Sequence, residues 1–424
     1  MVALKWTFKA TDRRCVVTSF RFIHAADLHL GSPFKGLSVK DEQLAALFSR
    51  ATRQALALLV TRSVELAVDF VVIAGDVYDG DWKDNKVGLF FNREMARLQR
   101  AGIPVYLLRG NHDAASVITK TITLPDNVHE FSTSKPATFL IEEKKVALHG
   151  QGFTDRAAYE NLAIGYPSAM AGWFNIGVLH TSMTGREGHE AYAPCSVDDL
   201  RSRAYDYWAL GHVHEFEIVA SDPLVVFPGN LQGRSIREQG ARGAVLVTVD
   251  DGIATVDRLI VDNARFISIG IDVTEGDLEV DVLKRIEDEV TRLSAEFDGK
   301  PIAARIRISG ICAFYDDLAR DRAQWLDEVL AACQRAYSDI WIEKLELRLS
   351  PAVTVAETPF AGVELLKALE VHGDDAIHVD EILMEILPKM PGGLATNDSP
   401  LGASNVELLK EARELLLARM AAAG

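Results

Sequence analysis

The fold is decided by residues 70–79, which read Phe-Val-Val-Ile-Ala-Gly-Asp-Val-Tyr-Asp. The apolar run 70–74, rich in β-branched side chains, predicts a buried strand. Gly75 lets the backbone turn sharply after it, so Asp76 comes to the carboxyl end of that strand. Open α/β sheets bind ligands at this end. The stretch therefore predicts a carboxylate at the mouth of a sheet.

Other polar motifs also follow apolar runs along the chain. They are Asp27-x-His29, Gly110-Asn111-His112-Asp113, His180 after Gly-Val-Leu, and Gly211-His212-Val213-His214. Oxygen and imidazole ligands at strand ends suit divalent first-row metals, and two such cations form a clamp for displacement at phosphorus. A single histidine of this kind is more often structural. Because five of the eleven histidines lie in these motifs, we interpret the set as a two-metal hydrolytic centre.

The order of predicted elements indicates an α/β fold. Strands are expected over 20–24, 70–74 and 104–108, with helices over 41–67 and 84–101 between them. From 137 to 260 the short apolar runs predict mainly strands. This order predicts a two-sheet αββα sandwich, with the sheets packed face to face and the helices outside.

A second pattern begins after residue 262. Strands over 266–271, 303–308 and 340–349 alternate with helices over 277–296 and 315–337. We therefore expect a sandwich domain over 20–262, a small α+β cap domain over 263–351 and a helical C-terminal region over 352–424, with helices at 361–370, 378–389 and 404–422. Residues 1–19 are expected to form a frayed or disordered extension.

Composition narrows the class of protein. The chain has 424 residues, a formal net charge of −16 and an apolar fraction of 48%, which allows a large core in more than one domain. The negative charge argues against a protein that coats nucleic acid, although bound cations can invert the field at a site. The four scattered cysteines indicate reduced thiols, and hence a cytoplasmic protein. We find no stretch apolar enough to span a membrane and expect no membrane association.

The ordered motifs resemble those of the calcineurin-like metallophosphoesterases. The sequence Gly-Asp-Val-Tyr-Asp at 75–79, the Gly-His-Val-His ending and the appended domain are similar to the SbcD-type DNA repair nucleases. The segment 179–194 resembles the YhaO-like branch of that group. The resemblance covers 20–260 well, 265–350 loosely and the tail hardly at all.

This resemblance implies two divalent metal ions, with manganese expected and iron or zinc as alternatives. One ion would be held by Asp27, His29, Asp76 and His214, and the other by Asp76, Asn111, His180 and His212, so Asp76 would bridge the two. A hydroxide between the metals would attack phosphorus in line. His112 would act as general acid for the leaving oxygen or as a donor to the transition state. Asp113 would orient that imidazole and raise its pKa, or would cap its loop as an Asx turn.

Two loops are candidates for substrate binding. Arg186, His189 and Tyr192 follow His180 in a glycine-rich loop, where they would contact a phosphate or stack on a base. Asn230 and Arg234 lie in a second loop after a strand, which would suit a DNA phosphate. The alternative for both segments is an ordinary structural loop.

Three functions remain open on the sequence. The first is a DNA phosphodiesterase, an exonuclease or endonuclease subunit in DNA repair, whose tail docks an SbcC-like or YhaN-like coiled-coil ATPase and which forms a homodimer, as the resemblance implies. The second is the same chemistry on a nucleotide or another small phosphoester. The third is a non-catalytic scaffold that binds DNA ends. The complete set of metal ligands weighs against the third.

Overall fold

The structure is a computed structural model, and the residues that it describes are 6–7, 19–32, 42–79, 85–115, 123–155, 158–183 and 192–351. It divides into two compact units. In the described part of the chain, the first holds residues 6–7, 19–32 and 46–265, and the second holds 42–45 and 266–351. The helices predicted beyond residue 352 lie outside the described residues.

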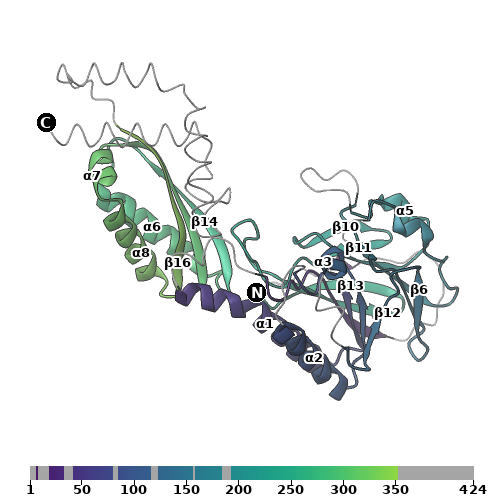
Figure 1. Cartoon of the computed structure of the whole chain (residues 1–424). Helices are drawn as coiled ribbons and strands as arrows, with labels where there is room; N and C mark the ends of the chain where they lie inside the picture. Colours follow the sequence, from purple (N-terminus) through teal and green to yellow (C-terminus); the bar gives the residue numbers. More distant parts are fainter. Residues whose placement is uncertain are drawn as a thin grey trace, which may run out of the picture. The chain divides into compact units, whose positions relative to one another are not determined.

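Two sheets form the first unit. The seven-stranded sheet has the order β1-β13-β12-β2-β3-β4-β5, and the six-stranded sheet has the order β10-β11-β9-β8-β7-β6. The bounds of the first sheet are β1 Trp6–Thr7, β2 Phe20–Ala25, β3 Phe70–Ala74, β4 Val105–Leu108, β5 Val128–Glu130, β12 Gly243–Asp250 and β13 Ile253–Ile260. Those of the second are β6 Ala137–Ile141, β7 Val146–Gly150, β8 Phe174–His180, β9 Tyr207–Gly211, β10 Glu217–Ser221 and β11 Leu224–Phe227. The expected two-sheet architecture is confirmed (Figure 1).

Strand β3 shows how the sequence builds the layers. Its side chains alternate between the two faces of the sheet. Phe70 and Val72 point into the core between the sheets, together with Val146, Ile176 and other buried side chains of the second sheet. Val71 and Ile73 join the core under the helices. Because both faces are covered, every residue of the strand is buried.

Helices cover the outer faces of the sandwich. Helices α1 (Glu42–Glu65) and α2 (Asn85–Arg100) pack on the seven-stranded sheet through one core. In α2 the buried side chains are Val87, Phe91, Met95 and Leu98, spaced as one helical face. Helix α5 (Val197–Arg201) begins with a capping box between Ser196 and Asp199 and packs on the six-stranded sheet with the short helix η1 (Leu162–Gly165).

Parallel strands bring the predicted motifs to one edge. Strands β2, β3 and β4 run parallel in one sheet, and β8 and β9 run parallel in the other. The carboxyl ends of these strands are followed by the loops that carry the motifs, and the short helix α3 (Asn111–Ala115) begins directly after β4. Five loops therefore meet at one mouth of the sandwich.

The second unit is a three-stranded sheet with helices on it. The strands β14 (Arg265–Val273), β15 (Ile302–Cys312) and β16 (Ile340–Pro351) lie in that order. Helices α6 (Glu279–Ser294), α7 (Tyr315–Arg320) and α8 (Arg322–Ala336) pack against it through a core of their own. The single helix predicted over 315–337 is broken, because the Asp321 side chain accepts a hydrogen bond from the Gln324 backbone and caps a new helix.

The N-terminal segment differs from its prediction. Trp6 and Thr7 pair antiparallel with Val256 and Thr255 of β13. These two residues therefore form an edge strand where the sequence predicted a frayed extension, because β13 offers an open edge with unpaired backbone groups. Among the described residues no helix is long and apolar enough to cross a membrane.

Candidate metal centre

The loops after β2 and β3 are held together by their backbones. The Asp27 N–H donates to Gly75 O at 3.0 Å, and the His29 N–H donates to Asp76 O at 3.0 Å. The backbone of these loops is unusual, with φ of 51° at Asp27, 42° at His29 and 54° at Asp76; in the loop after β9, φ is 101° at His212. Residues other than glycine adopt such angles rarely, and such strain gathers at functional sites.

Small residues let the loops approach one another. A Cβ atom on Gly110 would lie 2.2 Å from Asp76 Oδ1, and one on Gly211 would lie 2.0 Å from Ala74 O. Such distances are far below any van der Waals contact. Gly110 is therefore needed for the close approach of two neighbouring loops of one sheet, and Gly211 for the close packing of the two sheets at this mouth.

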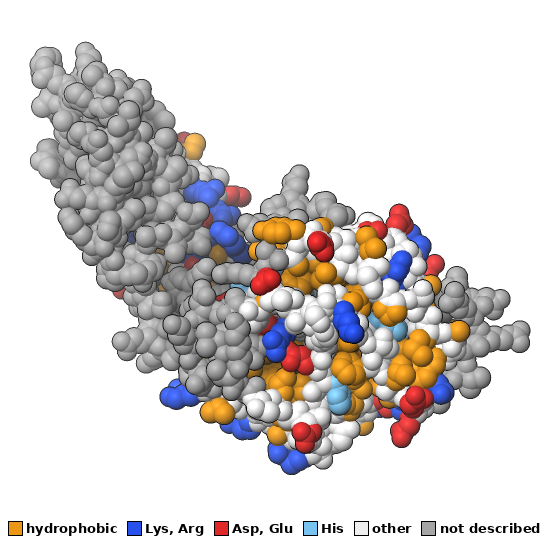
Figure 2. Space-filling model, turned by 45° about the vertical axis from the view of Figure 1, so that its right-hand side comes forward, with side chains coloured by type: hydrophobic (Ala, Val, Ile, Leu, Met, Phe, Trp, Pro, Cys, Tyr) orange, Lys and Arg blue, Asp and Glu red, His pale blue; other side chains and the backbone are white. Residues whose placement is uncertain are grey.

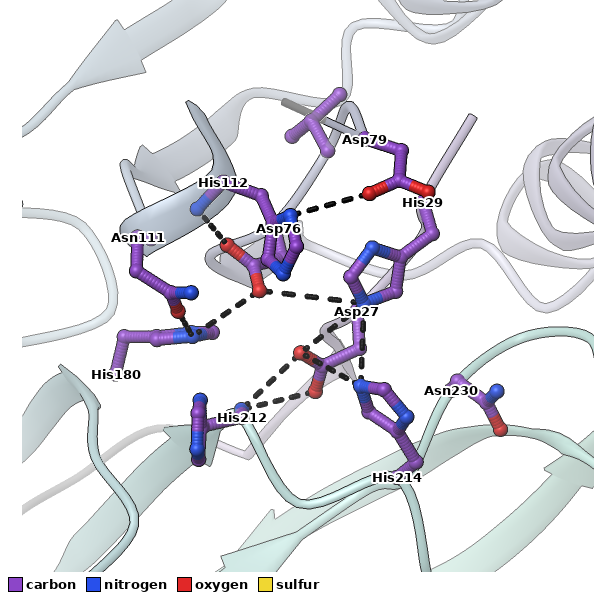
Figure 3. A network of polar contacts seen from close by, with 12 residues as sticks. Asp27, His29, Asp76, Asp79, Asn111, His112, His180, His212, His214 and Asn230 are labelled. Atoms are coloured by element: carbon purple, nitrogen blue, oxygen red, sulfur yellow. Dashed lines mark hydrogen bonds and ion pairs between the residues drawn. The ribbon is translucent and has the colours of Figure 1, made fainter. Parts of the chain in front are cut away.

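The loops bring together the side chains predicted to hold metals (Figure 3). Three groups have ligand atoms within 4.8 Å of one another: Asp27, His29 and His214; Asp76, His180 and His212; and His29, Asp76 and His112. Asp76 Oδ2 lies 3.9 Å from His29 Nε2 and 3.3 Å from His180 Nε2. This carboxylate thus lies between the two predicted ligand sets.

His180 presents a lone pair to oxygen atoms. Its Nδ1–H donates to Ala74 O at 2.9 Å, which leaves Nε2 as the acceptor of the neutral ring. Nε2 faces Asp76 Oδ2 at 3.3 Å and Asn111 Oδ1 at 3.0 Å. These three atoms all carry lone pairs, so a proton or a cation must lie among them. Burial lowers the pKa of His180, but Asp76 and Asp27 outweigh it and raise the pKa to about 9.

His214 and His29 bring imidazole nitrogens together on the other side of Asp76. His214 Nδ1 lies 2.8 Å from Glu238 Oε1, and the buried Nδ1 of His29 has no hydrogen-bond partner among the described residues. His214 Nε2 is 3.1 Å from His29 Nε2 and 3.8 Å from Asp27 Oδ1. The donor atoms on both sides of Asp76 therefore fit divalent cations. The assignment of each ligand to one ion stays a prediction.

Glu238 is a residue that sequence reasoning missed. Besides His214, its carboxylate accepts hydrogen bonds from Arg234 Nη2 at 2.9 Å and Asn230 Nδ2 at 2.9 Å. Carboxylates that hold the far nitrogen of a ligating histidine fix its tautomer. The ring of His214 is 24 residues away in sequence, and no local motif links the two. The pKa of Glu238 is held below its usual value, because its bonds to His214 and Arg234 outweigh burial.

His112 projects beside the cluster and is half-buried. Its ring centroid lies 5.1 Å from that of His29, and its Nδ1 lies 3.1 Å from Asp79 Oδ1. Burial lowers the pKa of the imidazole, but the hydrogen bond to Asp79 and the charge of Asp76 outweigh it, so the pKa is raised above its usual value. The protonated form, which can donate a proton, is thereby favoured.

Asp113 differs from its predicted catalytic role. Its carboxylate accepts backbone hydrogen bonds from Val77 at 3.2 Å, Tyr78 at 3.0 Å and Gly110 at 3.1 Å. These three bonds are those of a loop cap, the alternative role for this residue. The carboxylate found at 3.1 Å from His112 Nδ1 is that of Asp79.

The substrate candidates lie in different environments. Arg186 and His189 lie outside the described residues. Tyr192 is half-buried, with its ring 5.0 Å from that of His212. Arg234 is 18% exposed at its side chain and is tied to Glu238. Asn230 is fully buried, so it supports Glu238 and has no surface to offer a substrate.

Comparison with known proteins places the chain in a family. Residues 20–216 match the model of the calcineurin-like phosphoesterases, and residues 266–350 match the middle domain of metallophosphoesterase YhaO. An uncharacterized metallophosphoesterase YhaO of Bacillus subtilis is 32% identical in an alignment of 390 residues. The alignment covers 87% of this chain and 95% of that protein. The chain belongs to the YhaO family of calcineurin-like metallophosphoesterases. The predicted family is confirmed.

More distant relatives of this metallophosphoesterase share only part of the chain. The DNA double-strand break repair protein Mre11 of Sulfurisphaera tokodaii is 25% identical over 258 residues, 57% of this chain and 63% of that protein. A dimetal phosphatase from Danio rerio is 12% identical with a TM-score of 0.35, covering 57% of this chain and 97% of the other. A Thermus thermophilus protein of known structure is 13% identical with a TM-score of 0.32, covering 57% of this chain and 100% of the other.

Membership of this family makes the protein a phosphoester hydrolase that uses divalent metal ions. A pair of divalent cations polarises a phosphoester and acidifies water at such a centre. The chain's own part is to present Asp76 to both ligand sets, to fix the imidazoles of His180 and His214 by their far nitrogens, and to hold a protonated imidazole at His112. Which metal it uses stays a prediction.

Proposed function

We propose that this metallophosphoesterase is a DNA phosphodiesterase, with His112 as the general acid that protonates the leaving oxygen. The observation that carries the proposal is the ion pair of His112 with Asp79 next to the candidate ligands of both metals. A diester substrate has an alkoxide leaving group, which needs a proton more than an activated ester does. A half-buried imidazolium at this place meets that need.

A basic sheet face in the second unit supports a polyanionic substrate. Arg305, Arg307, Lys344 and Arg348 all lie within 4.0 Å of one carboxylate, Glu346. Arg305 also pairs with a second carboxylate, Glu343, at 2.8 Å. These residues alternate with the core residues of β15 and β16 and so lie on the face turned away from the helices. Four cations around two carboxylates leave a positive surface suited to phosphates.

The surface of the first unit favours no particular substrate. On the face shown in Figure 2, acidic and basic side chains are scattered among hydrophobic ones. The net charge of −16 favours a small phosphoester over DNA. The basic face of the second unit is therefore the feature whose role in DNA binding has to be tested. The name of the Mre11 relative, a DNA break repair protein, also favours DNA. An ATPase partner on residues 352–424 and a homodimer remain proposals.

Linear duplex DNA and a chromogenic phosphodiester, each with Mn²⁺, test the proposal. Wild type is expected to hydrolyse both substrates. His112→Ala should lower DNA hydrolysis by about 10²–10⁴-fold while DNA binding is retained, and His129→Ala, at a histidine with no assigned role, should behave as wild type. Arg307→Glu with Arg348→Glu should weaken DNA binding and leave the small diester unaffected, with Arg292→Glu as the matched charge reversal.

Other results would favour the alternatives. Hydrolysis of the small diester without any DNA hydrolysis, also after addition of the coiled-coil ATPase, would favour a small phosphoester as the substrate. DNA binding without hydrolysis of either substrate would favour a scaffold. If His112→Ala matched wild type, the assignment of the acid would be wrong.

A further inference from the structure

The second unit has an open groove that the proposed function does not use. It lies between the first turn of α6 and the segment that joins β15 to α7, with a volume of about 570 Å³. Its apolar wall includes Leu278, Val280, Leu283 and Phe314. Leu278 is 65% exposed and Val280 is 64% exposed. Two apolar side chains that are this exposed, two residues apart at the rim of one groove, indicate a binding surface.

The groove is acidic as well as apolar. Asp277, Glu279 and Asp317 line it, and its described lining residues include no lysine or arginine. Arg285 forms an ion pair with Asp277, with Arg285 Nη2 2.6 Å from Asp277 Oδ1. Burial and the neighbouring Glu328 and Asp317 raise the pKa of Glu279, so negative charges crowd this rim. The complementary surface is an apolar face that also carries cations.

The chain leaves the described structure next to this groove. Strands β15 and β16 are parallel, and their register places Pro351 opposite Cys312. Cys312 is followed directly by Ala313 and Phe314, which line the groove. Residues 352–424 therefore continue from a point beside the groove. A segment of the same chain could therefore occupy the groove without the recruitment of a partner.

One stretch of that continuation has the complementary pattern. At helical spacing, Glu407, Glu411 and Glu414 share one face of the predicted helix over 404–422. Another face holds Leu408, Ala412, Leu415 and Arg419, and the next holds Leu409, Arg413 and Leu416. The arginines thus lie with the leucines, and the acids lie apart from them. The predicted helix over 378–389 carries Asp380, Glu381 and Glu385 and matches an acidic groove less well.

We propose that residues 404–420 of the chain dock their leucine and arginine face into the groove between α6 and the β15–α7 segment. The leucines cover Leu278 and Val280, and Arg413 and Arg419 lie near the acidic rim. This assigns residues 404–420 to the second unit, whether or not the substrate is DNA, and leaves residues 352–403 for the ATPase partner proposed above.

Full-length protein tests the docking from the side of the groove. Leu278→Ser with Val280→Ser removes the exposed apolar surface, and serine at position 278 is a favourable N-cap for α6. Tryptic cleavage after Lys410 and Arg413 is expected to become at least about tenfold faster than in wild type, which corresponds to about 1.4 kcal/mol of lost docking. Leu89→Ser, at a leucine that is 63% exposed on α2, should leave the cleavage rate unchanged.

The reciprocal variant tests the same contact from the tail. Arg413→Glu with Arg419→Glu is expected to speed hydrogen exchange of the backbone amides over 279–283 and 313–318. Unchanged exchange in this variant, or unchanged cleavage in the serine variant, would overturn the proposal. Protection of the groove that depends on protein concentration, or that arises only with an added partner protein, would also overturn it in favour of a second copy or a partner.

Discussion

His112 has one carboxylate beside it in sequence and another beside it in space. Asp113 is its neighbour in the chain, but this side chain accepts three backbone hydrogen bonds. Asp79, in the loop after β3, reaches the imidazole at 3.1 Å. In the sequence, Asp79 is the last residue of the Gly-Asp-Val-Tyr-Asp stretch at 75–79. The pairing could not be read from sequence, because it depends on how two loops face each other.

Asp79→Asn is predicted to change the pH dependence of hydrolysis. The Asp79 carboxylate favours the imidazolium and so raises the pKa of His112; the amide removes that charge and lowers the pKa. A general acid acts in its protonated form, so activity is lost as pH rises through this pKa. The alkaline limb of the kcat profile should therefore move to lower pH.

Asp126→Asn, at an exposed carboxylate in the loop before β5, is the matched control and should leave the profile in place. An alkaline limb that does not move in Asp79→Asn would contradict the role of the pair.

Glu238 shows the limit of reasoning from motifs at the scale of single residues. The Gly-His-Val-His motif identified His214, and a ligating histidine implies a partner for its far nitrogen. The sequence did not say which of many acidic residues that partner is. Arg234 and Asn230, the residues predicted to contact substrate, both donate hydrogen bonds to this carboxylate.

Among the secondary-structure elements, local sequence signals predicted most of the strands and the turns between them. The run 70–74 became β3 with the bounds expected, because an apolar β-branched run buried on both faces has few alternatives. Short elements such as β5 and α3 were missed, since three to five residues carry too little periodicity. The break between α7 and α8 was marked by Asp321, a common N-cap residue whose signal was present in the sequence.

Gly110→Ala, in the turn between β4 and α3, is predicted to weaken metal binding. The added Cβ would meet Asp76 Oδ1 at 2.2 Å and Asp76 N at 2.8 Å. Either the turn or the carboxylate must move, at a cost of about 1–3 kcal/mol. Metal affinity, measured by calorimetric titration with Mn²⁺, should fall at least about tenfold while the protein remains folded.

Gly270→Ala serves as the control, because nothing lies within 4 Å of a Cβ at this position in β14. Equal affinity in Gly110→Ala and wild type would show that the close approach of this turn does not govern the ligands.

At the scale of the whole molecule, the sandwich converts sequence-distant loops into one site. Parallel strands in both sheets end at the same mouth, so ligands from residues 27 to 214 converge there. The order of strands and helices predicted this architecture, and the motifs predicted the mouth. The net charge of the whole chain predicted little about local surfaces, because it does not reveal the cluster of cations on β15 and β16 of the second unit.

Asp76 is predicted to serve two metal ions at once. Its Oδ2 lies between His29 and His180, which belong to different ligand sets. Elemental analysis of Mn²⁺-loaded protein, after removal of free metal, measures this directly. Wild type should retain two ions per chain, and Asp76→Ala should lose both while its circular dichroism remains that of a folded protein. One ion per chain in wild type, or an Asp76→Ala protein that keeps one ion, would contradict the bridging role of Asp76.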